Sequence, residues 1–350
     1  MVTVNWISSL AGFILLFWGI VPCLHAQGRD RLIKVTKDVY ARVVSPNGNA
    51  VGNSGFILFQ NSVLVFDTHY TPEAGNDLLN DIRSVTDNPV LYVVNSHFHP
   101  DHTHGNQVFA GAHLISNDGT RQNILQKDLP SLNRTIRITT DQLEKLQKQA
   151  ENEKDGDSFD SLHRQIKTLQ DYLATLSELK ISAPFVVLDD FFIIQDGSKE
   201  VRLQFLGPGH TDSDIILFLP SEKIAFLGDL FFNQAIPNVQ DANVLEWMKT
   251  LEKILELDCE QYVPGHGPVG NRQDVWKFLN YFEDLRALVD PFVIRGDSVE
   301  LAVQEIQLPV KYSRYRFQNF FPANIQKMYE ELKMSLLSSI PIEGPQKPEK

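Results

Sequence analysis

Cysteine is scarce in this chain of 350 residues, which contains only Cys23 and Cys259. If the amino-terminal leader described below is removed, one thiol remains and an internal disulfide is excluded. Cys259 lies just before an expected strand, in a context that favours a small buried filler over a metal ligand. The mature fold therefore has no covalent cross-link of its own.

Basic residues are also few, because 44 acidic side chains outnumber 32 Lys and Arg and give a net charge of −12. This balance argues against a nucleic-acid-binding surface, and it disfavours anionic substrates unless a metal binds them. The hydrophobic content of 43% is enough for a substantial core. We therefore expect a globular protein that acts on a small molecule and has no nucleic-acid partner.

No Lys or Arg precedes the first apolar stretch, Leu10 to Val21, although the stretch has the length of a signal-peptide core. We predict a signal peptide over residues 1–26, with cleavage after Ala26. The alternative is an uncleaved membrane anchor through residues 7–24, since a membrane span needs about 20 apolar residues. Either interpretation predicts export: a secreted or periplasmic protein, or one anchored in a membrane and facing away from the cytoplasm.

Four metal-ligating side chains, in contrast, lie within six residues, directly after the apolar run Val90 to Val94: His97, His99, Asp101 and His102. His97 and His99 are two residues apart, so in an extended segment they project to the same side and can share one ion. Asp101 keeps this spacing of two residues and His102 does not, so the chain must turn near Pro100. After such a turn, Asp101 and His102 can offer a second pair of donors to an adjacent cation. Packing gives no reason for such a cluster, and imidazole with carboxylate suits Zn²⁺.

Three later segments each add one donor in a turn that follows an apolar strand. They are His210 in the segment Gly207 to Asp212, Asp229 after Lys223 to Leu227, and His266 between Gly265 and Gly267. Each alone is typical of an ordinary turn. Sites in α/β proteins collect beyond the carboxyl ends of strands, so we expect all seven donors to converge.

From about Val39 to about Val269 the chain resembles the metallo-beta-lactamase-fold hydrolases, because Asp67, the histidine cluster, His210, Asp229 and His266 follow in the family's order. The resemblance implies an α/β fold, the four-layer αββα sandwich. It also implies two zinc ions: His97, His99 and His210 hold the first, Asp101, His102 and His266 hold the second, and Asp229 bridges them together with a water or hydroxide. Iron or manganese are the alternative metals. Such a centre needs no nucleophilic Ser or Cys. The catalytic residues that the resemblance implies are Asp101 and Asp229.

Three further residues are candidates for the surroundings of the metals. Family members carry an aspartate at the position of Asp67, which is our candidate for orienting a ligand imidazole. Two histidines depart from the family pattern, His69 and His104, where glycine is usual or frequent. We expect both to be solvated loop histidines, because every ligand position is filled; the alternative is an extra polar wall of the pocket.

Strands and helices alternate along residues 31–340, as in an α/β domain, with terminal helices over about 271–340 and a disordered tail over 341–350. A helical insertion occupies about residues 118–180. We expect its first helix to begin at a cap formed by Thr140 and Asp141, and its second to carry one apolar seam. The insertion is interpreted as a helical hairpin packed on the domain. The alternatives are a lid over the metals and a homodimer contact through residues 140–180.

The fold does not identify the bond that is cleaved, because the same type of metal centre occurs in several enzyme classes of this superfamily. These classes include lactamases, lactonases, thioesterases and sulfatases or phosphoesterases. True beta-lactamases of the family carry Cys or Ser where this chain has Asp229. We therefore hypothesise an exported dinuclear zinc hydrolase that opens an ester, lactone, thioester or lactam by attack of metal-bound hydroxide. The alternatives are an iron-dependent oxidoreductase of the same fold and a noncatalytic metal-binding module.

Overall fold

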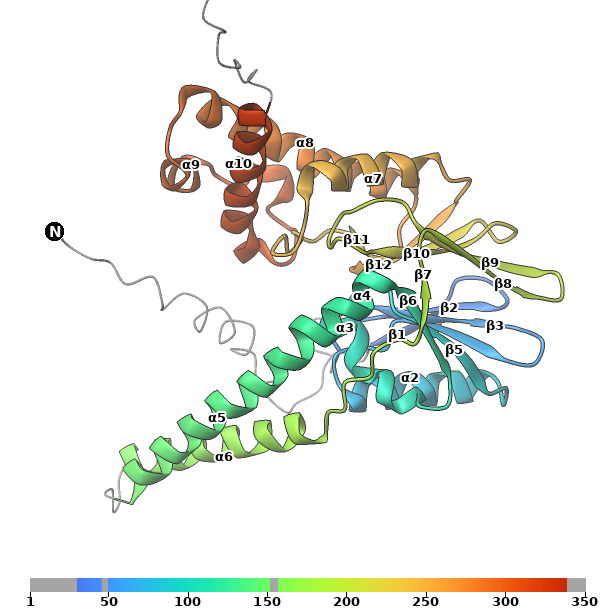
Figure 1. Cartoon of the computed structure of the whole chain (residues 1–350), viewed down its shortest axis with the longest axis horizontal. Helices are drawn as coiled ribbons and strands as arrows, with labels where there is room; N and C mark the ends of the chain where they lie inside the picture. Colours follow the sequence, from blue (N-terminus) through green and yellow to red (C-terminus); the bar gives the residue numbers. More distant parts are fainter. Residues whose placement is uncertain (1–29, 46–49, 152–156, 339–350) are drawn as a thin grey trace, which may run out of the picture.

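The computed structural model describes residues 30–45, 50–151 and 157–338, which form two β-sheets packed face to face with helices on both outer sides (Figure 1). The first sheet contains, in spatial order, β1 (Arg31–Lys34), β2 (Val39–Val43), β3 (Ser54–Leu58), β4 (Val63–Phe66), β5 (Val90–Val94), β6 (His113–Asn117) and β7 (Val186–Leu188). Strands β1 to β4 pair antiparallel, and β4 to β7 pair parallel.

The second sheet has the spatial order β12 (Gln261–His266), β11 (Ile224–Phe232), β10 (Ile215–Leu219), β9 (Lys199–Phe205) and β8 (Phe191–Asp196). Strands β11 and β12 are parallel, and the other pairs are antiparallel. Apolar side chains of both sheets fill the space between them. For example, the rings of Phe66 and Phe226 lie 5.6 Å apart.

Helices cover the outer face of each sheet, which completes the expected four-layer αββα sandwich. Helix α2 (Pro72–Val85) lies on the first sheet and buries Leu78 and Ile82, and it begins where the Thr71 side chain accepts a hydrogen bond from Ala74 N. Against the second sheet lie α7 (Val244–Glu256), α8 (Arg272–Arg295) and α10 (Phe321–Ser338). The shorter helices are α3 (Pro100–Thr103), η1 (His104–Phe109), α9 (Val299–Glu305), η3 (Val310–Tyr312) and η4 (Gln318–Phe320).

Among the described residues, the insertion is helical over a longer stretch than the sequence indicated. It consists of α4 (Asp118–Asn123), a π-helical turn η2 (Ile124–Asp128), α5 (Leu129–Ala150) and α6 (Asp157–Glu178). The predicted start at Thr140 is wrong, because α5 already begins at Leu129, with Pro130 in its favourable first turn. Inside the helix, the Thr140 hydroxyl donates to the carbonyl of Ile136 and needs no capping role.

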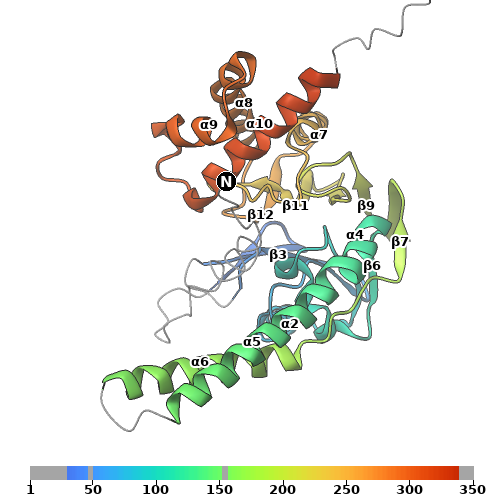
Figure 2. The same ribbon diagram turned by 60° about the vertical axis from the view of Figure 1, so that its left-hand side comes forward.

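Helices α5 and α6 pack against each other and project from the sandwich as a long hairpin (Figures 1 and 2). The apolar residues of the two helices lie within the hairpin, where α5 packs against α6 and Leu143, Leu146 and Ile166 are half-buried. Over most of its length the hairpin therefore projects away from the domain, in contrast to our interpretation of a hairpin packed on it. A lid over the metals stays a prediction. A homodimer contact through residues 140–180 stays a prediction.

Three features expected from the sequence lie outside the described residues. They are the signal peptide over residues 1–26, the alternative anchor through residues 7–24 and the tail over residues 341–350. Within the described ranges, no helix combines the length and apolarity that a membrane span requires.

Candidate metal centre

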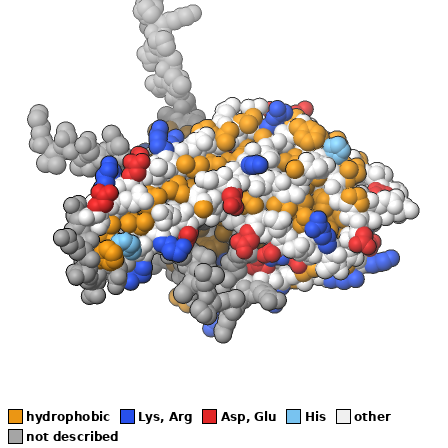
Figure 3. Space-filling view, turned by 90° about the horizontal axis from the view of Figure 1, so that it is seen from below, with side chains coloured by type: hydrophobic (Ala, Val, Ile, Leu, Met, Phe, Trp, Pro, Cys, Tyr) orange, Lys and Arg blue, Asp and Glu red, His pale blue; other side chains and the backbone are white. Residues whose placement is uncertain are grey.

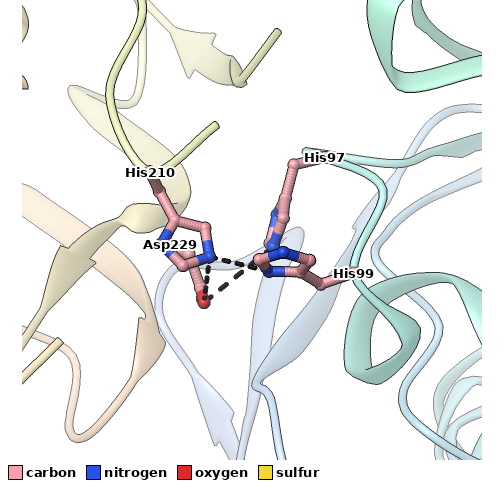
Figure 4. A group of neighbouring side chains, drawn as sticks. All are labelled: His97, His99, His210 and Asp229. Atoms are coloured by element: carbon pink, nitrogen blue, oxygen red, sulfur yellow. Dashed lines mark hydrogen bonds and ion pairs between the residues drawn. The ribbon is translucent and has the colours of Figure 1, made fainter. Parts of the chain in front are cut away.

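All seven predicted ligands converge at one edge of the two sheets, as two neighbouring groups. The first group is His97, His99, His210 and Asp229, and the second is Asp101, His102 and His266; within each group the donor atoms lie within 4.8 Å of one another. Figure 4 shows the first group, in which the three imidazoles and the carboxylate point toward a common centre. The division agrees with the two ligand sets that the family resemblance implied.

Asp229 lies between the two groups. Its Oδ2 is 3.3 Å from Nε2 of His210 and 3.9 Å from Nε2 of His97, both in the first group. The same carboxylate is 3.1 Å from Nε2 of His102 and 3.3 Å from Nε2 of His266, both in the second. This is the position that a bridging ligand would need.

Strand β11 positions Asp229 through an irregularity in its pairing with β12. We expected this aspartate just past the strand, but β11 continues to Phe232. The register shifts on either side of Gly228, whose φ is 51°. Such a bulge re-aims the following side chain, and glycine adopts this backbone conformation without strain. Asp229 thereby turns into the space between the sheets' edges.

The outer nitrogens of four imidazoles are held by hydrogen bonds. His97 donates from Nδ1 to Ser96 Oγ at 2.9 Å, His99 from Nε2 to Asp241 at 3.1 Å, His102 from Nδ1 to Asp67 at 2.8 Å, and His210 from Nδ1 to the carbonyl of Asn238 at 3.1 Å. These bonds fix each ring so that its other nitrogen faces the centre, where Nε2 of His210 and Nδ1 of His99 lie 2.8 Å apart. Nδ1 of the fifth, His266, has no hydrogen-bond partner among the described residues.

Burial and the site's own carboxylates set the charges of the imidazoles. Burial lowers the pKa of His97 well below its usual value and that of His210 to about 3, so both rings are neutral. Burial also opposes the charge on His102 and His266. There the carboxylates, with Asp229 contributing most, raise the pKa of His102 well above its usual value and that of His266 to about 9. A bound cation would replace these two protons.

The inner atoms of the centre fit divalent metal ions. Burial opposes ionisation of Asp101 and Asp229, but the neighbouring imidazoles lower both carboxyl pKa values well below their usual value. Nε2 of His97 is buried and lacks a hydrogen-bond partner within the described part of the chain, whereas Nε2 of His102 and Oδ1 of Asp229 are buried and face each other at 3.1 Å without the geometry of a hydrogen bond. Buried polar atoms without partners are costly, and nitrogen and oxygen donors arranged in this way suit zinc.

Asp67 occupies the orienting position that we expected for it. It follows β4 in a left-handed backbone conformation, with a φ of 60°, which aspartate tolerates better than most residues. One oxygen accepts a hydrogen bond from Ser96 N, and the other accepts from Ser96 Oγ and from His102 Nδ1. Burial raises the pKa of Asp67. The residue therefore fixes both the chain at Ser96 and the ring of His102.

Replacing Asp67 by alanine should weaken metal binding by about 10- to 100-fold, the usual scale for loss of a partner that orients a ligand. The weakening should affect one of two bound ions more than the other, because Asp67 contacts His102 directly. Titration of metal-free protein against a competing chelator measures this. Asp87→Ala, at an exposed aspartate after α2, is the matched control and should bind metal like the wild type. Equal affinities in the two variants would contradict the orienting role.

His69 and His104 are both buried, so our expectation of solvated loop histidines is wrong. His69 donates to the carbonyl of Gly52 and accepts from Ser54 Oγ, and burial together with Arg42 lowers its pKa to about 3. His104 donates to Asp128 at 3.1 Å and stacks on the ring of Tyr70. Neither belongs to a ligand group. The alternative, an extra polar wall of the pocket, stays a prediction.

The sequence analysis missed the partners that come from distant segments. Asp241, in the loop between β11 and α7, holds His99 and pairs with Lys127 of η2 at 3.4 Å. Asp128, the next residue of η2, holds His104. The root of the hairpin is thus linked to the metal centre through Asp241, which no spacing in the sequence could have indicated.

Comparison with known proteins identifies the family. A family model described as the metallo-beta-lactamase superfamily matches residues 47–116 and 150–266. The linear primary-alkylsulfatase of Pseudomonas sp. (strain ATCC 19151) is 23% identical over 273 residues, which is 72% of this chain and 49% of that protein. The type 2 metallo-beta-lactamase of Bacteroides fragilis is 38% identical over 90 residues, 24% of this chain and 36% of that enzyme. The chain spans about half of the first relative's length and less of the second's.

Solved structures agree at the level of the fold. The metallo-beta-lactamase from Pontibacter korlensis superposes with a TM-score of 0.54 and 16% identity, covering 73% of this chain and 99% of that one. DIM-1 metallo-beta-lactamase gives a TM-score of 0.52 and 15% identity over a similar share. The residues that the family model matches include all seven members of the two ligand groups. The chain belongs to the metallo-beta-lactamase superfamily.

Proposed function

We propose that this protein is an exported hydrolase that holds two zinc ions and cleaves an ester, lactone, thioester or lactam. The observation that carries the proposal is the position of Asp229, within 3.3 Å of imidazoles from both ligand groups. A single-metal site would not need a carboxylate there. Two zinc ions held by these residues would polarise the scissile carbonyl and lower the pKa of water toward about 7.

Asp101 is the residue best placed to handle the proton of the attacking water. Its side chain is 18% exposed, against 0% for His102 and 7% for His266, so it faces the open side of the centre. As the water oxygen bonds to the acyl carbon, Oδ2 of Asp101 would accept a proton. The carbon–oxygen, carbon–sulfur or carbon–nitrogen bond then breaks, and the same proton passes to the leaving atom.

The surface supports a small-molecule substrate over a nucleic acid. The net charge is −12, and on the face seen in Figure 3 the Lys and Arg side chains are dispersed among Asp and Glu. Near the centre, exposed portions belong to Asp101, to His99 at 14% and to Asp241 at 25%, and Asp241 pairs with Lys127, which is 51% exposed. Both signs of charge are therefore present at the rim, and an anionic group of a substrate would be left to the metals.

A second candidate reaction is hydrolysis of a sulfate ester. The relative that matches 72% of this chain is a linear primary-alkylsulfatase, whereas the Bacteroides fragilis beta-lactamase matches only 24%. The position of Asp229 is compatible with hydrolysis of either an acyl ester or a sulfate ester. Assays with both kinds of substrate therefore have to decide the reaction class.

The test combines metal analysis with a substrate panel. Protein purified without added metal should contain two zinc ions per chain, and it should hydrolyse at least one neutral ester, thioester, lactone or lactam. Removal of the metal with a chelator should abolish turnover, and added zinc should restore it. One tightly held iron, or a redox-active pair, would reject the zinc assignment in favour of an oxidoreductase. Turnover of alkyl sulfates alone would select the second candidate, and zinc-loaded protein without any turnover would support a noncatalytic module.

A further inference from the structure

His266 is held differently from the other four imidazoles of the centre. The outer nitrogens of His97, His99, His102 and His210 all donate to an oxygen acceptor. Nδ1 of His266 is buried and finds no such acceptor among the residues that the structure describes. Its Nε2 nevertheless faces the centre, 3.4 Å from Oδ2 of Asp101 and 3.3 Å from Oδ2 of Asp229.

Two phenylalanine rings take the place of the missing acceptor. Phe232 of β11 stacks on the imidazole, with ring centroids 4.8 Å apart and an interplanar angle of 22°. Phe317 meets the same imidazole at 89°, with centroids 5.6 Å apart. The imidazole is therefore in contact with one ring that is nearly parallel to it and with one that is nearly perpendicular to it. Offset stacking and edge-to-face contacts are the favourable arrangements of aromatic rings.

Phe317 reaches the centre from the carboxyl-terminal part of the chain, beyond the residues that match the family model. The neighbouring Arg316 donates from its backbone nitrogen to the carbonyl of Gln234 at 3.0 Å and accepts from Ile236 N at 2.9 Å. These bonds tie the segment to the chain directly after β11. Phe317 itself has a φ of 59°, in the left-handed region, where a bulky aromatic residue is strained.

We propose that Phe317 is a positioning residue that aims His266 at the second metal, and that the ion held by Asp101, His102 and His266 is the more weakly bound of the two. An oxygen acceptor on the outer nitrogen raises the basicity of a ligand imidazole, whereas an aromatic ring only orients it. The inference rests on the proposed dinuclear function. According to this inference, the segment that contains Phe317 sets the affinity of the site for the second metal.

Phe317→Gly is the sharpest test, because it removes the ring while glycine favours the existing backbone conformation. Titration of metal-free protein with zinc against a chromophoric chelator gives two dissociation constants. The larger should rise by about tenfold in Phe317→Gly, and the smaller should stay within about twofold of the wild-type value. Phe317→Tyr keeps the ring and should restore wild-type binding. Gln318→Gly, at the adjacent exposed residue, adds the same backbone freedom and also removes the hydrogen bonds that the Gln318 side chain donates to the carbonyls of Ser313 and Tyr315, so it is a strict control for loosening of the segment and should change neither constant.

Other outcomes separate this inference from the proposed function. Wild-type protein that binds two zinc ions, together with Phe317→Gly constants that are unchanged or equally weakened, would overturn the positioning role alone. The same loss in Gln318→Gly as in Phe317→Gly would also overturn it, because backbone freedom would then be the cause. Wild-type protein that binds fewer than two zinc ions would overturn the proposed dinuclear centre, and this inference with it.

Discussion

Replacing Asp229 by alanine is expected to release one metal ion and to lower kcat/KM by about a thousandfold, the upper scale for losing one group that stabilises a transition state. Asp229 is the side chain that approaches imidazoles of both ligand groups, so no neighbour can replace it. The fold should survive, because without this carboxylate His102 and His266 lose the largest cause of their raised pKa values and can become neutral instead of remaining as unpaired buried charges. Metal content, steady-state kinetics and circular dichroism of the same preparation measure the three effects.

Asp258→Ala provides the control for this prediction. Asp258 lies in the same half of the chain, but its side chain is 81% exposed and pairs only with the exposed Lys223. Surface ion pairs of this kind contribute little, so the variant should keep both metals and full activity. A normal metal content in Asp229→Ala, or an equal loss in Asp258→Ala, would show that Asp229 does not bridge the two groups.

The convergence of the seven donors could be predicted because each follows an apolar run of the sequence, although Asp229 lies within β11 and His266 is the last residue of β12. A strand such as Val90–Val94 must be buried in a sheet, and the carboxyl ends of neighbouring parallel strands meet at one edge. His97 and His102 are placed by this rule and by the one-turn helix α3 that begins at Pro100. Helix α2 was equally predictable, since Pro72 opens it and its apolar residues repeat with helical spacing.

The surroundings of the metals could not be predicted in the same way, because their partners are far apart in the chain. His104 is buried with its imidazole donating a hydrogen bond to Asp128, which comes from the inserted segment. His99 is oriented by Asp241, which is 142 residues away. A pattern in sequence reports local periodicity, whereas these pairs depend on how the hairpin root and the loop after β11 meet. Burial of a polar side chain is decided by such distant partners.

Gly265 illustrates a constraint that only the structure reveals. The sequence indicated a turn glycine next to His266, but Gly265 lies inside β12, against the bulge of β11. A Cβ atom at this position would lie 1.9 Å from Oδ1 of Asp229, 2.8 Å from the carbonyl carbon of Gly228 and 2.9 Å from the Asp229 nitrogen. Contacts this short do not occur between real atoms, so any side chain here must displace Asp229 or separate the two strands.

Gly265→Ala should therefore lower kcat/KM by at least about a hundredfold and destabilise the protein by about 1–3 kcal/mol, the usual range for overpacking a core. Kinetics, metal content and thermal unfolding of the variant measure both effects. Gly111→Ala is the control, since a Cβ at Gly111 meets no atom within 4 Å. If the clash acts through Asp229, adding Gly265→Ala to Asp229→Ala should cost little further activity, because coupled changes at touching residues are not additive. Independent losses in the double variant would show instead that Gly265 supports the strand pairing and not the position of the bridging carboxylate.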